Sequence, residues 1–138
     1  MLMLAATLSV FGKTPQQNQT MGHVKHIPQE DFTKLVADYT QQKWEYKGSK
    51  PAIVDFYANW CGPCRALAPV LEQVATEYKD SIVVYKVDVD DEKELAAAFG
   101  IRSIPTLLFI PMKGEPRITL GALNRKDLTE MVKKHLLK

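Results

Sequence analysis

Residues 54–69 read VDFYANWCGPCRALAP, and the order of residue types in this stretch decides the fold. Its first part completes a nearly continuous apolar run, Pro51 to Tyr57, which predicts a strand buried on both faces of a sheet. From Cys61 to Tyr78 apolar residues recur at helical spacing, with Pro69 as an expected kink. A buried strand that leads directly into a helix is typical of an α/β domain.

Strand and helix patterns alternate on both sides of this stretch. The strand pattern predicts four further strands, at residues 24–27, 82–89, 106–110 and 117–120. The last two flank a turn with glycine and proline, so we expect them to form an antiparallel hairpin. The sheet is therefore expected to be mixed.

Three further helices are expected, each with its own start signal. Pro28 suits the first turn of a helix whose inward stripe comprises Phe32, Leu35, Val36 and Tyr39. Asp90 and Asp91 are expected to cap a helix that closes at Gly100, and Asn124 to cap the last helix. With the helix that follows Cys61, this makes four helices around the sheet.

The composition is that of one folded domain. The chain has 138 residues, of which 46% are hydrophobic, so it is too apolar to be disordered. Its 18 Lys and Arg nearly balance its 16 Asp and Glu, giving a net charge of +2 without a block of basic residues. This balance gives no support for nucleic acid or an anionic membrane as a partner.

The N-terminal residues 1–21 are expected to be an extension ahead of a domain at 22–138. Met1 to Phe11 is apolar but shorter than the roughly 20 residues that span a bilayer. It would serve as a signal-peptide core, although no Lys or Arg precedes it and no clear Ala-x-Ala site follows. The alternative is a strand or helix packed on the domain. Residues 13–21 are polar and suit a linker. We expect a periplasmic or otherwise exported protein, with the cytoplasm as the alternative.

Cys61 and Cys64 are the only cysteines, so a multi-disulfide scaffold is excluded. They lie where the buried strand ends and a helix begins. Free N–H groups and the positive end of the helix dipole would lower the pKa of the Cys61 thiol and favour its thiolate. The spacing of three residues brings the two sulfurs within reach, so the pair would exchange with another protein's disulfide.

A metal site is the alternative use of this cysteine pair. The pair supplies only two of about four ligands, and His23 and His26 are the only nearby candidates by residue type. Both lie far upstream on a predicted edge strand, so we expect no metal. His135 falls on the inward stripe of the last helix and is expected to be a packed residue without a catalytic role.

Asp55 and Pro105 are unusual for their predicted positions. A carboxylate in a doubly buried strand loses hydration, so the pKa of Asp55 should rise, and the group would exchange a proton with Cys64. A structural ion pair with Lys86 on the neighbouring strand is the other interpretation, and both can hold together. Pro105 begins a predicted central strand, either as an ordinary trans proline or through a cis bond after Ile104.

Four segments together resemble the thioredoxin family: VDFYANWCGPCRALAP, KVDVDD, FGIRSIPTLLFI and LGAL, in this order. The similarity covers roughly Val24 to Lys138. It implies the thioredoxin fold, a five-stranded mixed sheet flanked by four α-helices. The chain departs from the family at Tyr57, where many members carry a second tryptophan, and in its N-terminal extension.

The resemblance also implies a mechanism and its residues. Cys61 would be the exposed nucleophile and Cys64 the resolving thiol, with Asp55 assisting deprotonation of Cys64 and Lys86 modulating Asp55. No cofactor is implied beyond this redox-active pair. An apolar substrate-docking surface would be formed by Trp60, Gly62, Pro63, Ile104, cis-Pro105, Gly121 and Ala122.

The Gly62-Pro63 pair is typical of reducing family members, which indicates a protein-disulfide reductase. A periplasmic oxidase or isomerase and a non-catalytic interaction subunit are the alternatives. The expected partners are disulfide-containing proteins and an electron donor, either a flavoprotein thioredoxin reductase or a membrane thiol donor. No stable membrane span is expected, and we expect a monomer.

Overall fold

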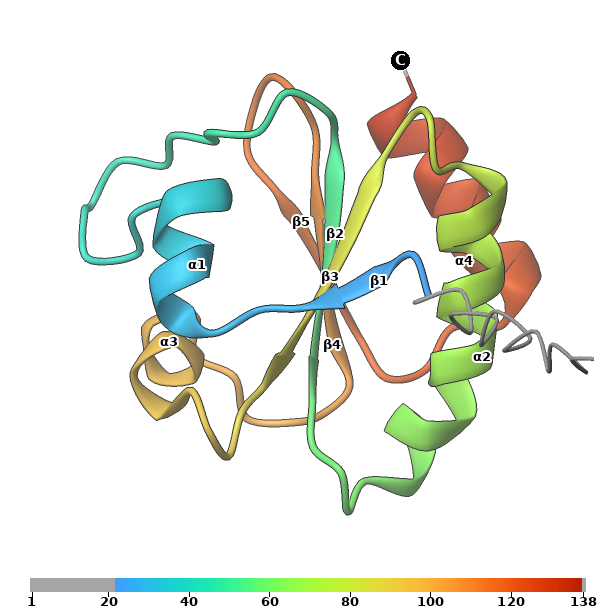
Figure 1. Cartoon of the computed structure of the whole chain (residues 1–138), viewed down its shortest axis with the longest axis horizontal. Helices are drawn as coiled ribbons and strands as arrows, with labels where there is room; N and C mark the ends of the chain where they lie inside the picture. Colours follow the sequence, from blue (N-terminus) through green and yellow to red (C-terminus); the bar gives the residue numbers. More distant parts are fainter. Residues whose placement is uncertain (1–21, 138) are drawn as a thin grey trace, which may run out of the picture.

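Five strands form one mixed sheet in the order β1-β3-β2-β4-β5 within residues 22–137, the part of the chain that the computed structural model describes (Figure 1). Strands β1, β2 and β3 run parallel, β4 is antiparallel to β2, and β5 is antiparallel to β4. The strand bounds are β1 Val24–His26, β2 Ala52–Tyr57, β3 Val83–Asp88, β4 Thr106–Ile110 and β5 Arg117–Leu120. The expected five-stranded mixed sheet is confirmed.

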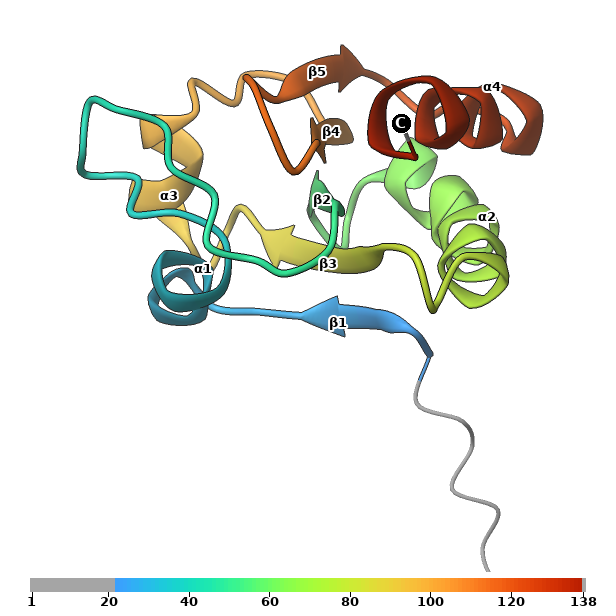
Figure 2. The same ribbon diagram turned by 90° about the horizontal axis from the view of Figure 1, so that it is seen from above.

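The four expected helices cover the two faces of this sheet in pairs. Figure 2 shows α1 and α3 on one side of the sheet and α2 and α4 on the other. Their bounds are α1 Gln29–Leu35, α2 Gly62–Glu77, α3 Lys93–Ala98 and α4 Arg125–Met131, with α4 continuing as a π-helical turn over Val132–Leu136. No helix in this part of the chain is long and apolar enough to cross a membrane.

Strand β2 is buried on both faces, as its apolar run predicts. Val54 and Phe56 pack in the core layer beneath α1 and α3, whereas Ile53 packs in the layer beneath α2 and α4. Side chains alternate along a strand, so Asp55 lies on the same face as Ile53, the face that α2 covers. The sheet therefore places a carboxyl group directly beneath the helix that carries the cysteines.

Two expected details are wrong for local reasons. Leu35 is 43% exposed rather than buried, because Phe32 and Val36, one helical turn apart, take the core-facing side and leave Leu35 at the flank of α1. Asp90 and Asp91 do not cap α3; its N-cap is Glu92, without a side-chain hydrogen bond. Instead, the Asp88 carboxylate accepts a hydrogen bond from the Asp90 N–H at 2.9 Å, which forms a turn ahead of the helix.

The expected cap of the last helix is confirmed, whereas the expected N-terminal extension is not tested. The Asn124 side chain accepts a hydrogen bond from the Asp127 N–H at 2.8 Å, so its predicted capping of α4 is confirmed. The N-terminal extension lies outside the described residues. Its linker, its signal-like core and the domain boundary at residue 22 stay predictions.

Candidate active site

The cysteine pair occupies the start of α2, four residues after the end of β2. Cys61 is the N-cap, with extended backbone, and its sulfur accepts a hydrogen bond from the Cys64 N–H at 3.2 Å. Pro63 lies in the first turn, where a missing N–H costs no helical hydrogen bond. The two cysteines form a disulfide, with their Cα atoms 5.2 Å apart. The helix start thus places the Cys61 sulfur against a backbone N–H of the first turn.

The two cysteines are equally buried, each 4% exposed, so the expected exposure of Cys61 is wrong for this disulfide form. They differ in what surrounds them. The Cys61 sulfur lies 3.6 Å from the carbonyl oxygen of Ile104, at the edge of the site. Cys64 lines a cavity of about 180 Å³ together with Asp55 and Lys86.

Asp55 is 4% exposed, and its Oδ1 has no hydrogen-bond partner among the described residues. Burial raises the pKa of Asp55 from 3.8 to about 7, and the positive charge of Lys86 opposes this rise. Because Asp55 and Cys64 line the same cavity, which is large enough for water, a proton can pass between them directly or through water. The geometry suits a group that takes up and releases a proton near neutral pH.

Lys86 lies opposite Asp55 in the pairing of β2 with β3, but no ion pair joins them within the described residues. Its ammonium nitrogen lies 5.3 Å from the centre of the Tyr57 ring, a cation–π geometry. Lys86 therefore acts on Asp55 through its charge at a distance rather than as a direct partner. The expected structural ion pair is not formed.

The predicted docking residues lie on three segments, and Ile104 packs against the two cysteines. Trp60 is 68% exposed, and its indole N–H donates to the Asp90 carboxylate at 2.8 Å. The Ile104–Pro105 peptide bond is cis, as the resemblance implies. The Gly121 N–H donates to the Pro105 carbonyl at 2.8 Å, and Gly121 has a φ of 87°, which disfavours other residue types.

A family model described as thioredoxin matches residues 23–134. This chain belongs to the thioredoxin family. A thioredoxin from Borreliella burgdorferi is 44% identical over 108 residues, which cover 78% of this chain and 92% of the relative. An M-type chloroplastic thioredoxin from Spinacia oleracea is 34% identical over 135 residues, covering 96% of this chain and 74% of the relative.

A solved structure supports the same assignment. The crystal structure of chloroplastic thioredoxin z superposes with a TM-score of 0.65 at 32% identity, covering 80% of this chain and 92% of that one. As a thioredoxin, the chain is a thiol-disulfide oxidoreductase that reduces protein disulfides through the Cys61–Cys64 pair. Its partners are proteins that contain disulfides and the reductases that donate electrons.

Thioredoxins need no cofactor, since the cysteine pair itself carries the two electrons. Within residues 22–137 no group of three or more His, Cys, Asp or Glu side chains is placed to hold a metal ion. The His26 ring instead contacts Tyr57 edge-on, with 6.3 Å between ring centres. His135, expected to be packed, is half-buried on the π-helical turn after α4.

Two features of this thioredoxin site escaped the sequence reasoning. Asp90 fixes the indole of Trp60, although its sequence suggested a helix cap. Leu120, at the end of β5 and next to Gly121, is 69% exposed and pairs with Thr106, the residue after Pro105. The sequence could have predicted the exposure of Leu120, because an apolar residue at the end of an edge strand has few neighbours to pack against.

Proposed function

We propose that this thioredoxin reduces the disulfides of other proteins with Cys61 as the nucleophile, Cys64 as the resolving thiol and Asp55 as the proton acceptor for Cys64. The observation that supports these roles is the shared cavity of Asp55 and Cys64 beneath the N-cap position of Cys61. Lys86 tunes Asp55 by lowering its pKa through charge.

The reaction begins from the reduced pair. The Cys61 thiolate attacks one sulfur of the substrate disulfide; that bond breaks, and the leaving sulfur takes a proton. Cys64 gives its proton to Asp55 and attacks the Cys61 sulfur, which releases the second substrate sulfur as a thiolate. The substrate has then gained two electrons, and this chain holds the Cys61–Cys64 disulfide. A flavoprotein reductase or a membrane thiol donor returns the electrons.

The substrate chain docks on the apolar surface around the disulfide in this proposal. The surface comprises Trp60, Gly62, Pro63, Ile104, Pro105, Gly121 and Ala122. The Ile104 carbonyl, 3.6 Å from the Cys61 sulfur, is placed to accept a hydrogen bond from an extended substrate segment. One chain carries both the cysteine pair and this surface, which supports a monomer as the working unit.

A trapping experiment tests the cysteine roles. Cys64→Ser leaves the nucleophile without its resolving thiol, so mixed disulfides with substrate proteins should accumulate on non-reducing gels. Cys61→Ser is the matched control and should trap little. Equal trapping by both variants would contradict the assignment of Cys61 as the nucleophile.

The reduction potential tests the direction of electron flow. The Gly62-Pro63 pair supports a reductase, for which we expect a potential near or below about −250 mV. A value of about −120 to −180 mV would mark an oxidase or isomerase instead. If the double variant Cys61→Ser with Cys64→Ser kept full biological function, the chain would be an interaction subunit rather than an enzyme.

We also propose that the protein is exported to the periplasm or an equivalent compartment. The apolar stretch Met1 to Phe11 supports this location, followed by a polar linker. Fractionation of cells that express the full chain should recover it outside the cytoplasm. Recovery with the cytoplasmic fraction alone would refute export and leave the reductase mechanism untouched.

A further inference from the structure

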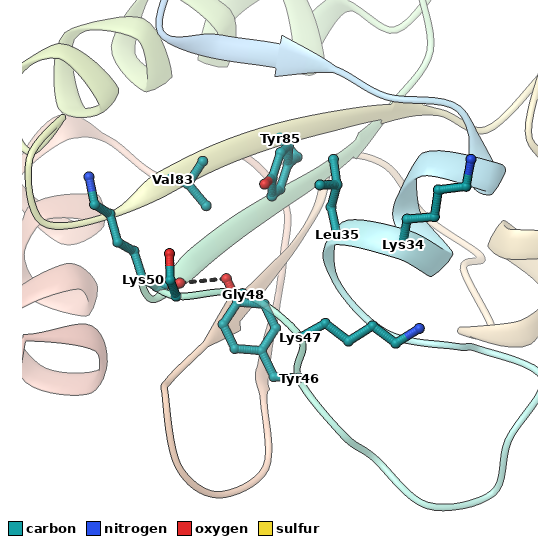
Figure 3. Close-up of a pocket in the computed structure, with 9 residues that line it drawn as sticks. Lys34, Leu35, Tyr46, Lys47, Gly48, Lys50, Val83 and Tyr85 are labelled. Carbon is teal, nitrogen blue, oxygen red and sulfur yellow. Dashed lines mark hydrogen bonds between the residues drawn. The ribbon is translucent and has the colours of Figure 1, made fainter.

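Two cavities lie next to each other at the end of the sheet where β1, β2 and β3 begin. The first is about 380 Å³ (Figure 3) and the second about 150 Å³, and both are lined by Lys50 and Val83. We call the pair the lysine groove, because its polar lining includes Lys25, Lys34, Lys47, Lys50 and Lys79. His23 lines it as well, and no Asp or Glu does.

The parallel strands explain why these lysines meet. Lys25 lies in β1 and Lys50 two residues before β2, so both are at the starting ends of their strands. Helices α1 and α2 run back from the far ends, which brings Lys34 and Lys79 to the same pole. The cysteine pair follows the other end of β2. The lysine groove and the disulfide therefore occupy opposite poles of the molecule.

The charges of the lysine groove are nearly uncompensated. Lys47 donates a hydrogen bond to the Thr33 carbonyl at 2.7 Å. The ammonium groups of the other four lysines have neither an ion pair nor a hydrogen bond within the described residues, where the one ion pair joins Arg125 to Glu77. Three acidic residues adjoin the groove without lining it. Glu45 precedes Tyr46 and Asp80 follows Lys79 in the sequence, and the Glu72 carboxylate accepts a hydrogen bond from the Val24 N–H at 3.1 Å.

The lysines diverge rather than converge on one point. Figure 3 shows Lys50 reaching to one side of the first cavity and Lys34 to the opposite side, with Lys47 directed away from the centre. Leu35, 43% exposed, lies between them beside the ring of Tyr85. A single small anion cannot meet ammonium groups that are spread in this way, whereas an extended anionic surface with an apolar interior can.

We propose that the lysine groove binds the surface of an anionic phospholipid bilayer. Clustered lysines bind phosphate headgroups at the membrane surface, and Leu35 adds apolar contact. The chain enters the groove at His23, and the preceding sequence carries the apolar stretch Met1 to Phe11. Where Met1 to Phe11 is retained after export, this apolar stretch and the basic groove would reinforce each other, because two weak membrane contacts together bind more firmly than either alone.

This arrangement points the Cys61–Cys64 disulfide away from the bilayer, toward soluble substrate proteins. Acidic residues Asp90, Asp91 and Glu92 lie at that outer pole, after the end of β3. The near-zero net charge does not reveal this separation of charge, because it adds the lysines at one pole to the acidic residues at the other. The proposal concerns a surface remote from the redox chemistry and stands apart from the proposed catalytic roles.

Vesicle binding of the full chain tests the proposal. The partition coefficient is measured by co-sedimentation with vesicles of one part phosphatidylglycerol to two parts phosphatidylcholine, and with vesicles of phosphatidylcholine alone. We expect strong preference for the anionic vesicles, weakening between about 0.05 and 0.5 M salt. The variant Lys34→Gln with Lys50→Gln should lower the partition coefficient roughly 30-fold, about fivefold for each lysine.

The matched control carries the same charge change outside the lysine groove, Lys93→Gln with Lys126→Gln. It should bind anionic vesicles within about twofold of the unaltered chain, and both variants should reduce a soluble disulfide substrate normally. Equal loss of binding in both variants would show that only net charge matters and would overturn the proposal. So would equal binding to both vesicle types, or displacement by inorganic phosphate at constant ionic strength, which would indicate a discrete anion site.

Discussion

Replacing Asp55 by Asn removes a carboxyl group whose charged form is poorly solvated in the folded protein. Burial raises the pKa of Asp55 from 3.8 to about 7, so between these pH values the native state holds a proton that the unfolded chain releases. Unaltered protein therefore loses stability as pH rises from about 4 to about 7, and above pH 7 the loss is constant. The variant Asp55→Asn has no carboxyl group to ionise at this position, so its stability does not fall in this way.

The magnitude follows from the two pKa values. A tenfold difference in proton affinity is worth about 1.4 kcal/mol, so the difference between 3.8 and about 7 corresponds to about 4 kcal/mol. The free energy of unfolding of Asp55→Asn should exceed that of the unaltered chain by about 2 kcal/mol at pH 5 and about 4 kcal/mol at pH 8. These are large changes for a domain of this size.

Urea unfolding of the oxidised protein, followed by circular dichroism at several pH values, measures this excess. Asp88→Asn is the matched control, because Asp88 is also buried but accepts hydrogen bonds from Asp90 and Asn59. It should lower the free energy of unfolding by about 1 kcal/mol or more. An excess for Asp55→Asn that does not change between pH 5 and pH 8 would refute the reasoning, because the effect would not then come from ionisation.

Three further predictions concern other parts of the molecule. Lys86→Gln removes the charge that lowers the pKa of Asp55, so the midpoint of the Asp55 carboxyl titration, followed by NMR, should rise above about 7; an unchanged midpoint would exclude coupling. Trp60→Ala should raise KM for a protein substrate while the free energy of unfolding stays within about 0.5 kcal/mol, since the indole is largely exposed. Asn124→Ala should cost about 1 kcal/mol in chemical denaturation through loss of the α4 cap, and a cost near zero would contradict that role.

The proposed catalytic centre could be predicted from the sequence because its residues are close together in the chain. Asp55, Cys61 and Cys64 lie within ten residues of one another, on one strand and the helix that follows, so the strand and helix patterns fix their relative positions. The contacts that support the centre were not predictable in this way. The Tyr57 ring meets Lys86 and the Trp60 indole meets Asp90 only once β2 and β3 pair, across about thirty residues of sequence.

Helix ends were predicted with mixed success for a similar reason. Asn124 caps α4 through a hydrogen bond to a residue three positions away, which the local sequence specifies. Leu35 fits the apolar stripe of α1 but is 43% exposed, because Phe32 and Val36 occupy the space beneath the helix and leave Leu35 at the edge of the stripe. Helical periodicity predicts which residues share one face of a helix. It does not predict how far the surface that covers this face extends.

The order of strands and helices, the buried strand β2 and the cysteine pair at a helix start all follow from patterns within short stretches of the sequence. The distribution of charge does not. Lys25, Lys34, Lys50 and Lys79 are spread along the chain, and a net charge of +2 carries no information about their positions. Only the tertiary structure brings them together, because parallel strands begin at one end of the sheet and the helices between them return the chain to that end.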